Sequence, residues 1–412
     1  MIFWILHKKT KLSDLYNKVE GTPSLFYQLF SSFRFVDISE YPVSRRIENR
    51  ILGLKYLPDF DELGINKKAY ILIKRKRDAV KLIRSVDPQN DIFIFQKIEE
   101  RSSLWSFLLL LNRYKIHTAL INNWQLPLQE RRKSYNLKTL VTIWNQDKRL
   151  FICKSLRFLS NYKKPKNQGS FDFSLSSGWG MIEEVERSGH ISIKKIIPVH
   201  SVSYDEFLDE RTHEKKLITT PYFVFVDQAL FIHPDNKEYN FTERDLYLYH
   251  NEIHKALRFF SQENNGCKIV IAQHPRIQYE RGFWDGFEVY NGVTANLIKF
   301  SEGVIGHFST SLNLAFLFEK KICLFTSSSS WFPFSLQVSQ YRSLLHCSMI
   351  DMNTLQKCKI KINRGKYTKA FLTKYYTLLP DDGRSNKDLF TKFLSNYSEF
   401  QEYGHTNRLS GV

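Results

Sequence analysis

Three stretches decide the fold: YFVFVDQ (222–228), KIVIAQHPR (268–276) and GVIGHFSTSLNLAFLF (303–318). Each begins with a short apolar run, rich in β-branched or aromatic residues, which is typical of a buried strand. Between the first two, Thr242 followed by Glu243 is an N-cap signal for a helix reaching about Gln262. Short apolar strands that alternate with helices predict a parallel sheet with helices on both faces.

The same alternation extends along the chain. In the second half we expect helices over Thr294–Ser301 and Leu312–Phe318 and a further strand over Ile322–Phe325. In the first half we expect strands at 2–6, 69–73, 92–95, 118–121 and 140–143, with helices at 78–85 and 102–114. A polar, irregular stretch after residue 200 divides the chain into domains 1–210 and 211–412. The predicted fold class is α/β, with a nucleotide-binding type of sheet in the second domain.

Polar residues follow three of the expected strands in the second domain. They are Asp227 with Gln228; His274, Pro275 and Arg276; and His307 with Ser309, Thr310 and Ser311. Carboxyl ends of parallel strands share one edge, where open α/β sheets bind ligands. The hydroxyl run precedes a helix, whose free N–H groups attract phosphate, although ordinary capping would also explain it. A histidine at a strand end can donate to a phosphate or a leaving group; its alternative role is structural.

Residues 221–327 resemble the nucleotide half of bacterial GT-B glycosyltransferases that use CMP-activated sugars, the sialyltransferases and Kdo transferases of surface polysaccharide and lipooligosaccharide synthesis. The shared features are the Asp-Gln strand end, the His-Pro motif and the Ser/Thr-rich turn before a helix. The resemblance implies a GT-B-like fold, with two Rossmann-type domains facing each other across a cleft. It also implies that the first domain binds the acceptor and the second binds the nucleotide-sugar.

The resemblance also implies roles for individual residues. His274 would contact the CMP phosphate, with Pro275, Arg276 and His307 beside it; Ser309, Thr310 and Ser311 would hold that phosphate. Asp227 would be the base for the acceptor hydroxyl, with His233 and Asp235 as alternatives. Asp381-Asp382-Gly383 follows the His-Pro motif, whereas the acidic-acidic-Gly motif of some sialyltransferases precedes it, so we interpret it as a turn before a C-terminal helix. Since no DxD pair follows a strand, we expect a metal-independent enzyme with no cofactor beyond its donor.

The net charge of +18 is concentrated in the first half of the chain. Residues 1–200 hold 35 basic and 19 acidic residues, a surplus of 16, and the remainder holds 25 and 23, a surplus of 2. Such asymmetry predicts a polyanionic partner: a nucleic acid, an anionic membrane surface or an acidic glycan. Residues 150–164 alternate apolar and basic residues at helical spacing, which indicates either a buried domain helix or a helix lying on an anionic membrane. We expect the second, on the inner face of the cytoplasmic membrane.

Other features narrow the class of protein. Five cysteines form no CxxC pair, which argues against a zinc site and a disulfide framework and favours a cytosolic protein. Residues 171–180 predict a strand running into a glycine turn at Gly178, Trp179 and Gly180, where either an acceptor approaches the backbone or the chain simply turns. The function predicted is transfer of a nonulosonic acid or Kdo from a CMP-sugar to a lipopolysaccharide or capsule acceptor. Alternatives are a UDP-sugar transferase, a CDP-glycerol-type polyol-phosphate transferase, a nucleic-acid-binding protein and a non-catalytic scaffold.

Overall fold

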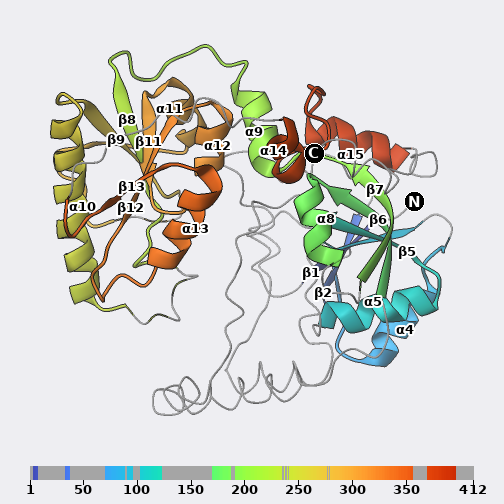
Figure 1. Cartoon of the computed structure of the whole chain (residues 1–412). Helices are drawn as coiled ribbons and strands as arrows, with labels where there is room; N and C mark the ends of the chain where they lie inside the picture. The colour runs from blue at the N-terminus through green and yellow to red at the C-terminus, as the bar shows by residue number, and fades with distance from the viewer. Residues whose placement is uncertain are drawn as a thin grey trace. The chain divides into compact units, whose positions relative to one another are not determined.

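The computed structural model describes residues 3–7, 33–37, 70–88, 91–95, 103–122, 169–186, 191–233, 236, 239, 241–275, 277, 279–355 and 369–395. They belong to two compact units (Figure 1). Unit 1 combines Met1–His200 with Thr373–Val412, and unit 2 is Ser201–Leu372. The units thus divide before the boundary expected at residue 210, and the C-terminal segment returns to the first unit.

Unit 2 contains one parallel sheet. Its strand order is β10-β9-β8-β11-β12-β13 and every neighbouring pair is parallel. The central strands β8 and β11 are buried along their whole length, as expected for a sheet covered on both faces. The strands are β8 (Tyr222–Val226), β9 (Lys268–Gln273), β10 (Glu288–Asn291), β11 (Gly303–Gly306), β12 (Lys321–Thr326) and β13 (Ser348–Asp351).

Helices flank this sheet, and three of them match the helices expected at 242–262, 294–301 and 312–318. A helix over Val202–Glu210 forms in the stretch after residue 200 that was expected to be irregular, and the helix over Ser335–Leu345 was not predicted. The Thr242 hydroxyl accepts a hydrogen bond from the Asp245 N–H at 3.2 Å, and the Asp245 carboxylate accepts one from the Thr242 N–H, a capping box that starts the longest helix. Its buried stripe includes Ile253, Leu257 and Phe260. The helices are α9 (Val202–Glu210), α10 (Glu243–Glu263), α11 (Thr294–Phe300), α12 (Leu312–Leu317) and α13 (Ser335–Leu345).

Unit 1 contains a second parallel sheet, with the order β3-β2-β1-β4-β5-β6-β7. Its strands are β1 (Phe3–His7), β2 (Phe33–Asp37), β3 (Tyr70–Leu72), β4 (Ile92–Phe95), β5 (His117–Asn122), β6 (Gly169–Ser176) and β7 (Ile191–Pro198). The helices are α4 (Lys76–Arg84), α5 (Ser103–Arg113) and α8 (Trp179–Glu186). Buried residues of α4 and α5 pack with Phe93 and Phe95 of β4 in one core cluster. The strand expected at 140–143 lies outside the described residues.

The C-terminal segment packs on unit 1. Its helix α15 (Asn386–Ser395) buries Leu389, Phe390 and Phe393 against Ile92 and Ile94 of β4. The helix before it, α14 (Lys369–Tyr375), begins in unit 2 and ends in unit 1, because the division of the chain falls after Leu372. The sequence prediction kept 211–412 together because no local pattern shows that the apolar stripe of α15 covers a sheet built from the first 200 residues.

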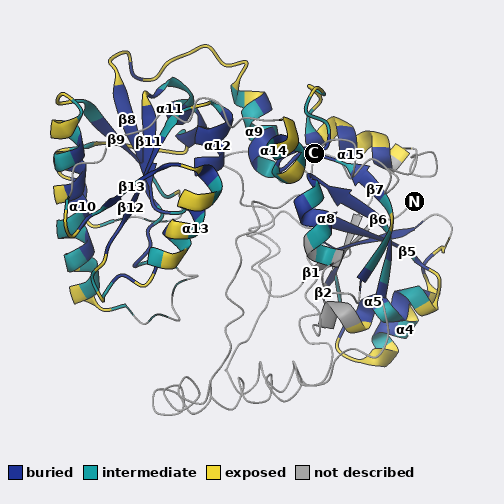
Figure 2. Cartoon of the chain, in the orientation of Figure 1, coloured by how far each residue is buried: buried dark blue, intermediate teal, exposed yellow. Residues whose placement is uncertain are grey.

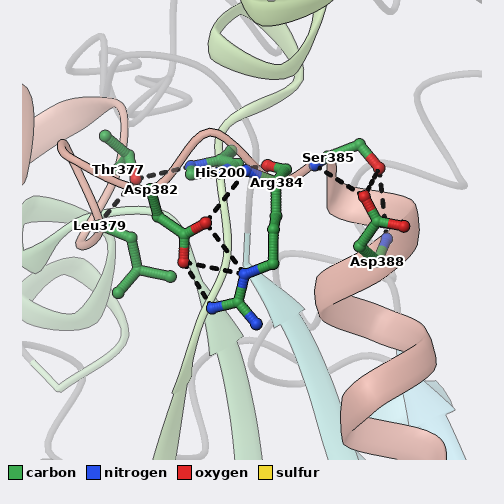
Figure 3. A network of polar contacts seen from close by, with 7 residues as sticks. All are labelled: His200, Thr377, Leu379, Asp382, Arg384, Ser385 and Asp388. Atoms are coloured by element: carbon green, nitrogen blue, oxygen red, sulfur yellow. Dashed lines mark hydrogen bonds and ion pairs between the residues drawn. The ribbon is translucent and has the colours of Figure 1, made fainter.

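A network of polar contacts around the buried His200 fixes this segment, and Figure 3 shows the part that includes Thr377, Asp382 and Arg384. The Asn386 side chain accepts from the His200 N–H at 2.8 Å and donates to the His200 carbonyl at 3.0 Å. The His200 ring joins the Thr377 hydroxyl at 2.7 Å and the Arg384 carbonyl at 2.9 Å. The Asp382 N–H bonds back to the Leu379 carbonyl at 3.1 Å. Asp381-Asp382-Gly383 is therefore a turn ahead of α15, as predicted.

The predicted fold class is confirmed in both sheets. Counted along the chain within each unit, both orders begin 3-2-1-4-5-6, the order typical of Rossmann-type domains that bind nucleotides. Helices cover both faces of each sheet (Figure 1). None of the helices within the described ranges combines the length and apolarity needed to cross a bilayer.

Candidate functional site

The order of the unit 2 sheet locates the place where a ligand would bind. The chain builds β8, β9 and β10 outward in one direction, and then returns to place β11 on the other side of β8. In doubly wound sheets, ligands bind outside the carboxyl ends of the two strands at such a reversal. Asp227 follows β8 and His307 follows β11, so two of the three predicted polar loops flank the reversal.

Asp227 joins the loop after β8 to the loop after β9. Its Oδ1 accepts from the Ala229 N–H at 2.8 Å, and its Oδ2 accepts from the His274 N–H at 3.2 Å. The Tyr279 hydroxyl lies 2.8 Å from Oδ1 and 2.9 Å from Oδ2 and donates to this carboxylate. The carboxylate therefore fixes the backbone at His274 and anchors Tyr279.

Gln228 joins the same loop to the third. Its Oε1 accepts from the Phe308 N–H at 2.8 Å, at the point where the chain leaves β11. Asp227 and Gln228 are adjacent in sequence, so one dipeptide at the end of β8 connects all three loops. The expectation that the loops lie on one edge of the sheet is confirmed by these bonds.

The burial of Asp227 defines what this carboxylate can do. Its side chain is 3 % exposed, and burial raises its pKa, while the bonds from Ala229, His274, Tyr279 and Gln228 act in the opposite direction. Burial also raises the pKa of Tyr279, which therefore stays protonated and remains a donor. A carboxylate enclosed by its own loop is suited to positioning and is poorly placed to take a proton from an acceptor. The geometry thus disfavours Asp227 as the base.

His274 and His233 lie side by side at this edge. Their ring centroids are 4.8 Å apart and the rings meet edge to face, with both side chains half-buried. His233 lies in the loop after β8, and His274 is the residue that follows β9. Pro275 is exposed next to them. Arg276 and Asp235, two further predicted site residues, lie outside the described residues.

His307 differs from its predicted role. It is 0 % exposed, and its Nδ1 lies 2.7 Å from the Phe325 carbonyl, so Nδ1 carries the proton. Its Nε2 therefore accepts from the Tyr249 hydroxyl at 3.1 Å. Burial lowers the pKa of His307 to about 4, so the ring is neutral at physiological pH. With both nitrogens bonded inside the core, His307 holds β11 to β12 and α10 and has no nitrogen left for a phosphate.

The Ser-Thr-Ser run forms the turn before α12. The Ser309 hydroxyl is buried and accepts from the Ser311 N–H at 3.2 Å, which is local turn stabilisation. Thr310 is exposed and Ser311 is half-buried, so these hydroxyls lie nearer the surface than that of Ser309. Because α12 has six residues and the Leu312 N–H bonds back to the Ser309 carbonyl, the helix end offers fewer donors than expected.

The structure adds groups at this edge that the sequence reasoning missed. Ser327 and Ser329, in the loop after β12, donate to the two carboxylate oxygens of Glu252 on α10 at 3.0 and 3.4 Å. In the same loop, the half-buried Trp331 packs on Phe231, with the two ring centroids 5.5 Å apart. Hydroxyls, a carboxylate and an aromatic face suit the hydroxyls and rings of a nucleoside or sugar. The sequence signal was the serine run after the predicted strand 322–325, a pattern also typical of a plain loop.

Of the predicted acceptor-side residues, Gly178 lies between β6 and α8, and Trp179 and Gly180 are the first two residues of α8. A Cβ on Gly178 would lie 2.4 Å from the Lys374 carbonyl oxygen, and one on Gly180 would lie 3.0 Å from the same atom. Both glycines therefore admit the backbone of α14, and Trp179 packs at the edge of a small core cluster. The space that the glycines leave is filled by the chain itself, so their structural reason is packing within unit 1.

Comparisons with known proteins find similarity of architecture. No protein-family model matches the chain, and no curated protein matches it. Among solved structures, it is similar to the UDP-GlcNAc 2-epimerase of Methanocaldococcus jannaschii, with 10 % identity over 96 % of this chain and 99 % of that chain and a TM-score of 0.42. It is also similar to the glycosyltransferase SnogD from Streptomyces nogalater, with 10 % identity over 97 % and 95 % and a TM-score of 0.37. A putative UDP-N-acetylglucosamine 2-epimerase from Listeria monocytogenes gives 8 % identity over 98 % of both chains and a TM-score of 0.41.

Proposed function

We propose that this protein is a metal-independent glycosyltransferase whose second unit binds a nucleotide-sugar at the carboxyl ends of β8, β9 and β11. The observation that carries the proposal is the joining of three polar loops at the strand-order reversal by one dipeptide, Asp227-Gln228. That reversal is where Rossmann-type sheets bind nucleotides. A buried carboxylate whose bonds all hold neighbouring loops indicates a site built in advance of its ligand.

The reaction requires two tasks at this edge. The bond between the anomeric carbon and the phosphate oxygen breaks, so negative charge accumulates on the departing nucleotide, and the acceptor hydroxyl loses its proton as its oxygen bonds to that carbon. Electrostatic stabilisation of the departing charge is usually the larger contribution. In the proposal His274 donates an N–H to the phosphate, and the turn at Ser309–Ser311 provides the hydroxyls of Thr310 and Ser311.

In the proposal His233 is the base that takes the proton of the acceptor hydroxyl. Of the groups considered for the base, Asp227 is enclosed by its own loop, whereas His233 is half-buried and lies against His274. Two imidazoles side by side can take separate roles: one donates to the phosphate of the leaving group, and the other takes the proton of the acceptor. General base catalysis of this kind contributes typically ~10²–10⁴-fold. Asp227 then acts as a positioning residue that holds the backbone of His274 in place.

For the donor we propose a CMP-activated nonulosonic acid or Kdo, and for the acceptor a bacterial surface glycan such as lipopolysaccharide or capsule. The support is the likeness of the Asp-Gln, His-Pro and Ser/Thr motifs to those of CMP-sugar transferases. A UDP-sugar transferase and a CDP-glycerol-type polyol-phosphate transferase fit the same edge. These donors differ in the nucleobase and in the number of phosphate groups, so binding measurements with the nucleotides can distinguish them.

Calorimetric titration of the full chain with CMP, UDP and CDP tests the proposal. We expect CMP to bind at least about tenfold more tightly than UDP, a difference of about 1.4 kcal/mol. Tighter binding of UDP would replace the CMP donor, and tighter binding of CDP would favour the polyol-phosphate reaction. If none of the three nucleotides binds while DNA or RNA binds with a steep salt dependence, the protein belongs to the nucleic-acid-binding class and the proposed function is wrong.

A further inference from the structure

The helix α4 of unit 1 presents a dense row of positive charge to solvent. Residues 74–84 read KRKRDAVKLIR, with six basic residues and one acidic residue, a surplus of five in a single short segment. The basic residues are all exposed, as the yellow colour on part of α4 in Figure 2 indicates. Four of them line a hollow of about 470 Å³: Lys76, Arg77, Lys81 and Arg84.

The carboxylate of the one acidic residue in this segment, Asp78, already has partners within the segment. The Asp78 carboxylate accepts from the Arg75 N–H at 2.9 Å, which starts the helix. Its other oxygen lies 3.8 Å from Arg77 Nε, in an ion pair whose arginine side chain is 75 % exposed. An exposed pair of this kind holds an arginine only weakly. The positive charge of the four residues that line the hollow is therefore only weakly offset within the segment.

The opposite face of α4 is committed to the core. Ala79, Leu82 and Ile83 are buried, with exposures of 0, 7 and 2 %, and they pack with Phe93 and Phe107 of the unit 1 core. A helix whose apolar face is used inside its own domain cannot insert that face into lipid. Any partner must then bind to the charged face alone, through long side chains at the surface.

We propose that the charged face of α4 is a docking surface for an anionic lipid bilayer. A bilayer offers a flat sheet of phosphate groups that a row of lysines and arginines on one helix face can meet together. Single-stranded nucleic acids, by contrast, are bound on grooves with aromatic rings for the bases. The 74–84 segment contains no aromatic residue. The inference stands apart from the proposed activity, because binding to a surface requires no nucleotide.

Sedimentation of the full chain with vesicles tests this surface. We expect binding to vesicles of phosphatidylcholine mixed with phosphatidylglycerol, and none to phosphatidylcholine alone. Raising the salt from about 0.1 M to about 1 M, which shortens the Debye length from ~10 Å to ~3 Å, should release the protein. The triple variant Lys76→Glu, Lys81→Glu, Arg84→Glu should lower the bound-to-free ratio at least about tenfold.

A matched control separates a local surface from net charge. The triple variant Arg244→Glu, Lys255→Glu, Arg258→Glu changes the charge by the same amount on exposed positions of α10 in unit 2. We expect it to bind anionic vesicles as the wild type does. The neutral variant Lys76→Gln, Lys81→Gln, Arg84→Gln, with circular dichroism to verify folding, should also bind more weakly.

Three results would overturn the proposal. They are equal loss in the α4 and α10 variants, no binding of the folded wild-type chain to anionic vesicles at low salt, and binding to a nucleic-acid homopolymer without binding to vesicles. Nucleotide titration of the same variants gives a separate readout. If the α4 variant binds nucleotide normally and loses vesicles, the two proposals stand independently.

Discussion

The substitution Asp227→Ala should lower the free energy of unfolding of the chain by about 3 kcal/mol, because it leaves several buried donors without an acceptor. Two backbone N–H groups, of Ala229 and His274, and the Tyr279 hydroxyl all bond to this carboxylate. Each such group left unpaired costs roughly 1–3 kcal/mol, partly offset because a buried charge is no longer desolvated. Urea-induced unfolding monitored by tryptophan fluorescence, with Trp284 and Trp331 in unit 2, measures the change.

The same variant should lose nucleotide affinity by at least about tenfold, because the loop after β9 is no longer tied to the loop after β8. Tyr279→Phe is the matched control. It removes one donor and leaves the carboxylate bonded to both N–H groups, so we expect a loss of about 1 kcal/mol and near-normal nucleotide binding. An Asp227→Ala protein with wild-type stability and wild-type affinity would contradict the role given to this residue.

The second large effect is expected for His274→Ala. We expect turnover to fall by about 10²–10⁴-fold, because the departing phosphate loses its donor, while the protein stays folded. The imidazole is half-buried, and the backbone N–H that bonds to Asp227 remains in the variant. Steady-state kinetics with a CMP-sugar donor and thermal unfolding on the same preparations measure the two quantities.

Two further histidine variants serve as a control and as a test of the proposed base. His213→Ala removes a half-exposed histidine that pairs with Glu210 at 3.3 Å, and it should leave turnover unchanged. His233→Ala should lower turnover by about 10²–10⁴-fold, because the acceptor hydroxyl loses the base that takes its proton. Turnover of His274→Ala within about twofold of wild type would remove His274 from the mechanism.

The elements of unit 2 that position the site were predictable from local sequence. Strands β8 (Tyr222–Val226) and β11 (Gly303–Gly306) coincide with the apolar runs that begin two of the three quoted stretches, since buried central strands are short continuous apolar runs. By contrast, β10 was not predicted, because its sequence EVYN is mostly exposed and has no apolar run. In unit 1, β7 was likewise missed, since ISIKKIIP carries two lysines within an apolar strand.

The details of the site depended on contacts that local patterns do not contain. The hydrogen bond between Gln228 and Phe308 joins residues 80 positions apart, and the bond from Tyr279 to Asp227 spans 52. A histidine beside a Ser/Thr-rich turn gives the same sequence pattern whether its ring faces a ligand or the core. Only the packing of Tyr249 and Phe325 around His307 shows that it faces the core.

The glycines near residue 180 illustrate the same limit. A Gly-x-Gly turn after a strand is typical both of a ligand site and of a close backbone contact. A Cβ placed on Gly178 would lie 2.4 Å from the Lys374 carbonyl oxygen, which indicates a close backbone contact. That contact involves a segment almost 200 residues away in sequence. The return of the C-terminal segment to unit 1 thus accounts both for the close contact at Gly178 and for a division of the chain before residue 210.

The most direct test of the proposed function is a crystal structure of the full chain with CMP bound. We expect the phosphate to lie between the ends of β8 and β11, within hydrogen-bond distance of the turn at Ser309–Ser311 and of the His274 side chain. A nucleotide bound on another face of unit 2, or on unit 1 with this edge unchanged, would contradict it.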